Sequence, residues 1–212
     1  VTPLKTKDGL HDISFINTEE ELEATLIASS REINTCIVHH TGTFLDQILT
    51  AQEIHDAYIK KNVSEGIPYH FIILKDGTLQ RGRRIDDESF HAGTSYKTYS
   101  IGIAFVGGIN LHSVEADRRG GRAGFIADIK SNTGDSFTSA QWATFAQFIK
   151  VWYQVVPYGQ VLGHKDINQS GTLDPGFNVA NYIQSRFGRA NTIDGSTISG
   201  TGGGQDDAFI SG

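Results

Sequence analysis

The order of apolar and polar residues along the chain predicts a protein that mixes strands with helices. Four runs rich in apolar and β-branched residues predict strands at 33–40, 69–74, 78–83 and 99–107. The last of these runs is almost continuously apolar, which is typical of a buried strand. Asp76-Gly77 separates the second run from the third, and an Asp-Gly pair between apolar runs predicts a β-hairpin.

Apolar residues at helical spacing and capping residues predict helices at 18–30, 50–62, 138–156 and 178–187. Thr18 is followed three residues later by Glu21, which is the signature of a capping box. Thr138 opens the longest predicted helix, and the aromatic residues along one face of that helix are expected to lie in the core.

Three segments lack a periodic pattern. Residues 1–17 are expected to form an N-terminal extension with a short strand near 13–16. Residues 108–136 are rich in glycine and charge, and a loop of this length inside a domain is usually functional. Residues 188–212 are rich in Gly, Ser and Thr and predict a tail or linker. The folded domain is therefore expected at 18–187.

The composition of the 212 residues disfavours several classes of protein. The formal net charge is -6, whereas a nucleic-acid-binding protein usually presents a basic face, so no nucleic-acid partner is expected. No window of about 18 apolar residues occurs, so no membrane insertion is expected either. Cys36 is the single cysteine, which rules out an internal disulfide framework and a cysteine-rich zinc site.

Side chains suited to zinc gather in the segment 161–178 (VLGHKDINQSGTLDPGFN), which holds His164 and Asp174. A catalytic zinc site needs three protein ligands and one open position for water. His164 and Asp174 can supply two ligands, because the polar turn between them lets the segment fold back on itself. The predicted strand that ends at His39-His40 can supply the third. Since side chains alternate along a strand, only one of these two histidines faces the site.

Six motifs in this order, IVHHTG, PYHFIILKDGTLQRGR, FHAG, SIGIAFVGG, GHKDI and TLDPG, resemble the type-2 family of N-acetylmuramoyl-L-alanine amidases. That family shares its fold with peptidoglycan recognition proteins and with the small amidase lysozymes of short-tailed phages. The resemblance covers roughly residues 33–187. It implies an α/β fold with a central mixed β-sheet flanked by helices, and a zinc site on one face of that sheet.

The resemblance also implies roles for individual residues of this chain. The zinc ligands would be His39, His164 and Asp174, with His40 pointing away. The catalytic residues would be Tyr69 and Thr172. The residues at the substrate groove would be His91 and Thr41.

The mechanism that the resemblance implies is zinc-dependent hydrolysis of peptidoglycan. Zn²⁺ would hold a water that attacks the amide between the lactyl group of N-acetylmuramic acid and L-alanine. Tyr69 and Thr172 would help zinc to stabilise the oxyanion. Some members carry a Glu where this chain has Ala104, so the chain lacks that proton acceptor.

These roles imply a phage-encoded lysin that acts on bacterial peptidoglycan at the cell wall, in the periplasm. Two forms are considered: a free endolysin, and a tail-associated enzyme joined to the virion or another module through 188–212.

Two non-enzymatic readings compete with the amidase. One is a recognition module that binds muropeptide without cutting it, and many such modules lack the third zinc ligand. The presence of Asp174 argues against that reading. The other is a structural virion subunit with a decayed enzyme fold, which the presence of Tyr69 disfavours.

Overall fold

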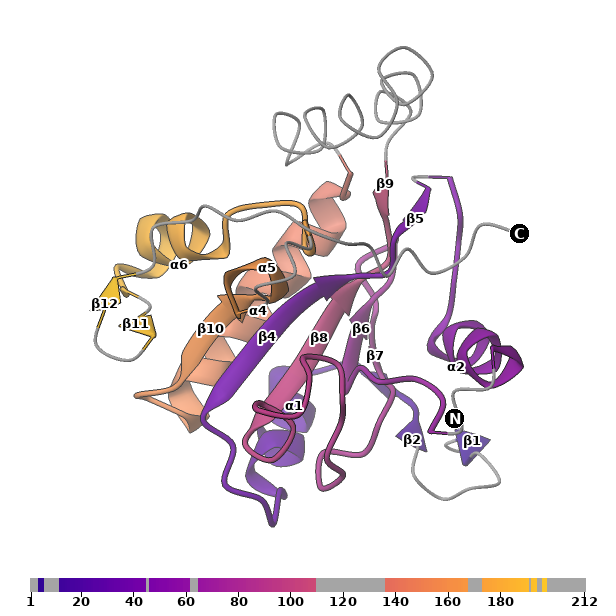
Figure 1. The fold of residues 1–212 in the computed structure, drawn as a ribbon, viewed down its shortest axis with the longest axis horizontal. Coiled ribbons are helices and arrows are strands. Elements are labelled where there is room, and N and C mark those ends of the chain that lie inside the picture. Colours follow the sequence, from indigo (N-terminus) through magenta and orange to yellow (C-terminus); the bar gives the residue numbers. More distant parts are fainter. Residues whose placement is uncertain are drawn as a thin grey trace.

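A six-stranded sheet forms the centre of the structure (Figure 1). The computed structural model describes residues 4–5, 12–44, 46–61, 65–109, 136–167, 173–190, 192–193 and 196–197. Across the sheet the strands are β10 (Gln160–Gly163), β4 (Thr35–His40), β8 (Ser100–Phe105), β6 (Phe71–Ile73), β7 (Leu79–Arg81) and β3 (Phe15–Ile16).

The sheet is mixed, as the family resemblance implies. β10, β4, β8 and β6 run parallel to their neighbours, whereas β7 pairs antiparallel with β6 and with β3. The β6–β7 pair is the hairpin expected around Asp76-Gly77, and Gly77 has the positive φ of 88° that such a turn requires. The expected fold class, a central mixed sheet flanked by helices, is confirmed.

Three short ladders lie outside the central sheet. They join β1 (Leu4–Lys5) with β2 (Asp12–Ile13), β5 (Thr43–Phe44) with β9 (Gly108–Ile109), and β11 (Thr192–Ile193) with β12 (Ser196–Thr197). Most of the segment expected to be irregular, residues 110–135, lies outside the described residues, as do residues 198–212 of the expected tail.

The predicted helices are present, each shorter than its predicted range. In the described part of the chain the helices are α1 (Glu19–Ile27), α2 (Ala51–Lys60), α4 (Ser139–Val155), α5 (His164–Ile167) and α6 (Val179–Phe187). Thr18 caps α1 as predicted, with its Oγ1 accepting the Glu21 N–H at 3.1 Å. The Glu21 carboxylate reaches one residue further back than a capping box requires, to the Asn17 N–H at 2.7 Å.

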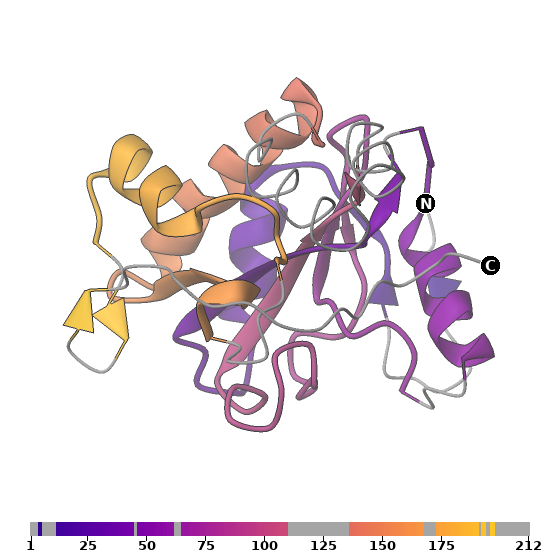
Figure 2. The same ribbon diagram turned by 45° about the horizontal axis from the view of Figure 1, so that its top comes forward.

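Alternation along the strands gives the sheet two different faces. Val38 and Ile103 belong to the larger core, which is covered by α1, α4 and α6. Ala104 and Ile72 belong to a smaller core on the other face, against α2. In Figure 1, α4 lies behind the sheet and α2 lies at the right of the view, and Ala51 and Ile54 of α2 belong to the smaller core. Figure 2 shows the same arrangement after a turn of 45°. His39, the neighbour of Val38, therefore projects on the face of the smaller core.

The N-terminal segment contributes to the central sheet. β3 pairs with β7, with Phe15 opposite Gln80 and Ile16 opposite Leu79, and Ile16 is buried in the larger core. The short strand expected near 13–16 thus forms the edge of the sheet. Among the described residues, no helix has the length and apolar character needed to cross a membrane.

A buried histidine just before β6 joins the start of that strand to β8 and to the loop after β7. His70 Nδ1 accepts the Gly102 N–H at 3.0 Å, and its Nε2–H donates to the Asp87 carbonyl at 3.0 Å. The amide can only donate and the carbonyl can only accept, so these partners select one neutral tautomer. Burial lowers the pKa of His70 to about 3, and the nearby Arg31 and Arg83 charges act in the same direction.

The larger core depends on aromatic residues of α4. Phe148 is fully buried, and its ring lies 5.1 Å from that of Phe71. We expect Phe148→Ala to lower the free energy of unfolding by about 3–5 kcal/mol, because it removes buried apolar surface and leaves a cavity. Tyr158→Ala is the control, since Tyr158 is 99% exposed, and it should change stability by less than about 0.5 kcal/mol. Urea denaturation measures the free energy of unfolding of both variants. An equal loss of stability in Phe148→Ala and Tyr158→Ala would contradict the packing of Phe148 in the core.

His70 makes stability depend on pH. Its folded-state pKa of about 3 lies below the ordinary value of 6.5, so the unfolded chain binds a proton first as the pH falls. His70 therefore costs no stability above pH 6.5 and progressively more down to pH 3. Between pH 7 and pH 5 its share of the loss should be about 2 kcal/mol. Urea denaturation with a chelator present should show a shallower pH dependence for His70→Gln. Parallel curves for the two proteins would contradict the assignment.

Candidate functional site

Two strand ends and one loop bring together a cluster of metal-ligand side chains. β10 runs parallel to β4 with Gly163 opposite Val38, so the next residues, His164 and His39, emerge side by side. Asp174 approaches from the loop before α6. One donor atom of each of these three residues lies within 4.8 Å of the others. The structure thus brings together the three residues that the sequence resemblance assigns to zinc.

Asp174 holds the cluster together. Its Oδ2 lies 2.8 Å from His39 Nδ1 and 3.0 Å from His164 Nδ1. Its Oδ1 accepts the His40 backbone N–H at 2.6 Å, and its own carbonyl accepts the Lys165 N–H at 2.7 Å. The two imidazole Nδ1 atoms and the carboxylate therefore face one point, and backbone contacts fix the carboxylate.

The electrostatics of the cluster favour the forms that bind a metal. Burial lowers the pKa of His39, and Asp174 offsets only part of that effect. Burial works against ionisation of Asp174, but the charges of His39 and His40 and the hydrogen bonds from His164 and His39 outweigh it, so its pKa is well below the usual range. A neutral imidazole and an ionised carboxylate are the states that ligate metals.

The donor set fits a zinc ion. Two imidazole nitrogens and one carboxylate oxygen are ligands typical of catalytic zinc, which keeps one further position open. Ligand atoms around a tetrahedral zinc at about 2.1 Å lie roughly 3.4 Å apart. Asp174 Oδ2 lies 2.8 and 3.0 Å from the two imidazole Nδ1 atoms, somewhat closer than that spacing, and the three donor atoms lie within 4.8 Å of one another.

The strand places the neighbouring His40 differently. Its Nδ1 accepts the Gly42 N–H at 3.0 Å and lies 3.9 Å from Asp174 Oδ1. Successive residues of a strand point to opposite faces, and His40 does not belong to the three-residue cluster. The sequence pattern left two candidates for the third position, and the tertiary structure selects His39.

Tyr69 lies beside the cluster. Its ring centroid is 5.2 Å from that of His39, and Tyr69 is 8% exposed. Its hydroxyl is 3.3 Å from the hydroxyl of Tyr58 on α2. Tyr58 was not among the predicted site residues, because no motif marks it and its position on a helical face carries no sign of this contact.

The other predicted site residues differ in placement. His91 is buried beneath His39, with its Nδ1 2.9 Å from His39 Nε2. Thr41 is buried, and its Oγ1 accepts the Gly107 N–H at 3.0 Å and lies 2.8 Å from Thr43 Oγ1. Thr172 lies outside the described residues. Thr41 therefore ties the end of β4 to the segment after β8.

The residue opposite His39 on β8 is Ala104. Its methyl group is buried in the smaller core. The position at which the sequence resemblance suggested a proton acceptor thus holds an apolar side chain in this chain.

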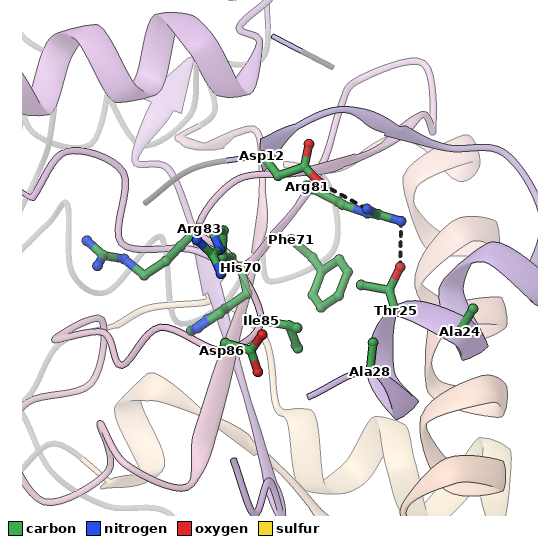
Figure 3. A pocket seen from close by; sticks show the side chains of 11 residues that line it. Asp12, Ala24, Thr25, Ala28, His70, Phe71, Arg81, Arg83, Ile85 and Asp86 are labelled. Carbon is green, nitrogen blue, oxygen red and sulfur yellow. Dashed lines mark hydrogen bonds and ion pairs between the residues drawn. The ribbon is translucent and has the colours of Figure 1, made fainter. Parts of the chain in front are cut away.

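A hollow of about 320 Å³ lies away from the cluster (Figure 3). It is lined by α1, β7 and the segment after β7, and no residue of the cluster lines it. Arg81 crosses it, donating to Asp12 Oδ2 at 3.1 Å and to Thr25 Oγ1 at 2.6 Å (Figure 3). Because Arg81 is paired with Asp12 and Thr25 within the protein, the hollow is a weaker candidate for the functional site than the His-His-Asp cluster.

Comparison with known proteins agrees with this geometry. Residues 29–177 match the family of N-acetylmuramoyl-L-alanine amidases (Amidase_2). The chain is 23% identical over 155 residues to the endolysin of Enterobacteria phage K11, covering 73% of this chain and 88% of that relative.

Two solved structures have folds similar to that of this chain. The endolysin N-acetylmuramoyl-L-alanine amidase LysCS from Clostridium intestinale URNW is 25% identical, with a TM-score of 0.54 over 74% of this chain and 85% of that one. Human PGRP-IBETAC, solved in complex with glycosamyl muramyl pentapeptide, is 21% identical, with a TM-score of 0.53 over 74% of this chain and 85% of that one. At that identity the second likeness concerns the fold alone. The family match spans most of the chain and contains all three residues of the cluster, so the chain belongs to the N-acetylmuramoyl-L-alanine amidase family and is an amidase, a peptidoglycan hydrolase.

Proposed function

We propose that this protein is a zinc-dependent amidase that hydrolyses the bond between the lactyl group of N-acetylmuramic acid and L-alanine of the peptide stem. One observation carries the proposal. His39, His164 and Asp174 converge with donor atoms within 4.8 Å, inside the segment that matches an amidase family.

The three residues of the cluster would hold the metal. When bound, zinc supplies Lewis acidity, which lowers the pKa of a water and polarises the scissile carbonyl. The chain supplies a rigid frame for this chemistry. β4 fixes His39, the start of α5 fixes His164, and the His40 N–H holds one oxygen of Asp174 so that the other faces the histidines.

Tyr69 is proposed as a donor to the oxygen that becomes negative during attack. Its ring lies next to His39, and the Tyr58 hydroxyl at 3.3 Å helps to set the direction of its own hydroxyl. A donor placed in advance stabilises developing charge without reorganisation at the moment of reaction. Thr172, two residues before Asp174, is proposed as a second donor on the basis of the sequence resemblance. Ala104 supplies no proton acceptor opposite His39.

The proposed setting is the bacterial cell wall, reached in the periplasm, with peptidoglycan as the substrate. The likeness to a phage endolysin supports a phage-encoded free endolysin over a tail-associated enzyme. We further propose that the catalytic domain is the expected range 18–187 extended at its start by β3, which pairs in the central sheet, and the match at 29–177 supports this range. A muropeptide-binding module without catalysis is disfavoured, because Asp174 and Tyr69 are both retained beside the two histidines.

Removal of one ligand tests the metal site. We expect one zinc per wild-type chain by elemental analysis, together with lysis of bacterial walls. His164→Ala should lose both, because two remaining ligands hold zinc weakly. Tyr158→Ala, which alters a 99% exposed side chain, is the handling control. Wild-type protein that lyses walls after complete removal of metal would refute zinc dependence, and thermal unfolding of the variant checks that it folds.

Loss of the Tyr69 hydroxyl tests the proposed oxyanion donor. Tyr69→Phe should keep its zinc and lower kcat by about 10²–10³-fold, with little change in KM, because the contact is made mainly in the transition state. Tyr58→Phe should lower kcat less, since its hydroxyl acts through Tyr69. Tyr158→Phe is the matched control for loss of a hydroxyl. An unchanged kcat for Tyr69→Phe would exclude the role.

A further inference from the structure

A chain of hydrogen bonds runs from the proposed zinc ligand His39 into the interior. His39 Nε2 lies 2.9 Å from His91 Nδ1. His91 Nε2 lies 3.1 Å from Ser100 Oγ, and Ser100 Oγ donates to the Tyr96 carbonyl at 2.6 Å. Both ring nitrogens of His91 are thus engaged inside the protein.

The Tyr96 carbonyl, the last acceptor, sets the direction of every hydrogen bond in this series. A carbonyl oxygen can only accept, so the single hydroxyl proton of Ser100 points to Tyr96. Ser100 Oγ must then accept from His91 Nε2–H, which leaves His91 Nδ1 without a proton. His91 Nδ1 therefore accepts from His39 Nε2–H. The remaining nitrogen of His39, Nδ1, lies 2.8 Å from the Asp174 carboxylate, which can only accept, so Nδ1 donates there; a metal held between Asp174 and His164 would take the place of that proton.

Small residues on β8 make room for His91. Ser100, Gly102 and Ala104 alternate along the strand and so share one face. A Cβ at Gly102 would lie 2.9 Å from Cγ of His91, closer than side chains tolerate. The absence of a side chain at Gly102 lets the imidazole lie against the strand, between the anchor Ser100 and the ligand His39, whose strand partner is Ala104.

We propose that His91 is a positioning residue for His39, anchored by Ser100, and that it acts through the metal site without touching substrate. The proposal rests on the proposed zinc site. A metal-bound histidine usually donates its other N–H to a partner that fixes its tautomer and orientation and raises its strength as a ligand. His91 supplies that partner here, although the sequence resemblance had placed it at the substrate groove.

Zinc affinity is the decisive measurement, made by competition with a chromophoric chelator on the full chain. His91→Phe keeps an aromatic ring but cannot accept from His39, and it should weaken zinc binding about 10–100-fold. His91→Asn, whose amide oxygen can take the place of Nδ1, should recover most of the affinity. His55→Phe is the matched control and should leave the affinity unchanged. It makes the same exchange at a histidine that is also 6% exposed but bonds the Ile67 N–H.

Ser100→Ala removes one hydroxyl and tests the anchor with the least disturbance of the fold. It should weaken zinc binding in the same direction as His91→Phe, by a smaller factor. At saturating zinc both variants should keep the wild-type KM, because neither residue touches substrate in this proposal. A raised KM with unchanged zinc affinity would instead identify His91 as a substrate contact and overturn the inference.

The outcomes separate the two proposals. If wild-type protein binds no zinc, the proposed zinc mechanism fails and the positioning role fails with it. If wild-type protein binds zinc while His91→Phe and Ser100→Ala bind it equally tightly, the zinc site stands and the positioning role is refuted. Thermal unfolding of each variant shows whether a lost affinity reflects loss of the fold.

Discussion

The parallel pairing of β10 with β4 is the constraint on which the site depends. Gly163 lies opposite Val38, so His164 and His39 leave the sheet together although 125 positions separate their numbers in the sequence. A shift of one residue in this register would send one histidine to the opposite face. The buried apolar residues of β4 and β10 hold the register, because the larger core admits only one set of side chains on its face.

The two faces of the sheet have different roles: one packs the larger core and the other carries the candidate site. The face under α1, α4 and α6 packs large aromatic and aliphatic groups, whereas the opposite face holds His39, His91 and the small residues of β8. Burying the rings of His39, His91 and His70 is costly unless each finds a partner. Asp174, Ser100 and backbone groups provide the partners. The contacts of Asp174 and Ser100 also orient His39 and His91 at the proposed metal site.

The proposed catalytic groups are held by elements that contribute little chemistry themselves. α2 brings Tyr58 to Tyr69, and β8 brings Ser100 to His91. Each of these contacts spans two elements, so the precision of the site depends on the packing of the whole domain. The hollow beside α1 lies outside this arrangement, and its Arg81 is paired with Asp12 and Thr25.

The sequence by itself determined the features that depend on near neighbours. The cap at Thr18, the Asp76-Gly77 hairpin and the strand ending at His39-His40 follow from residues a few positions apart, and the motifs in order indicated the family. Alternation along the strand left His39 and His40 open and the motif resemblance assigned His39, whereas only the tertiary structure shows the contact of His39 with Asp174, 135 positions away. It also decided that β3 completes the sheet and that His91 lies beneath His39. The physical reason is that caps and turns are local, whereas these contacts exist only once distant strands have paired.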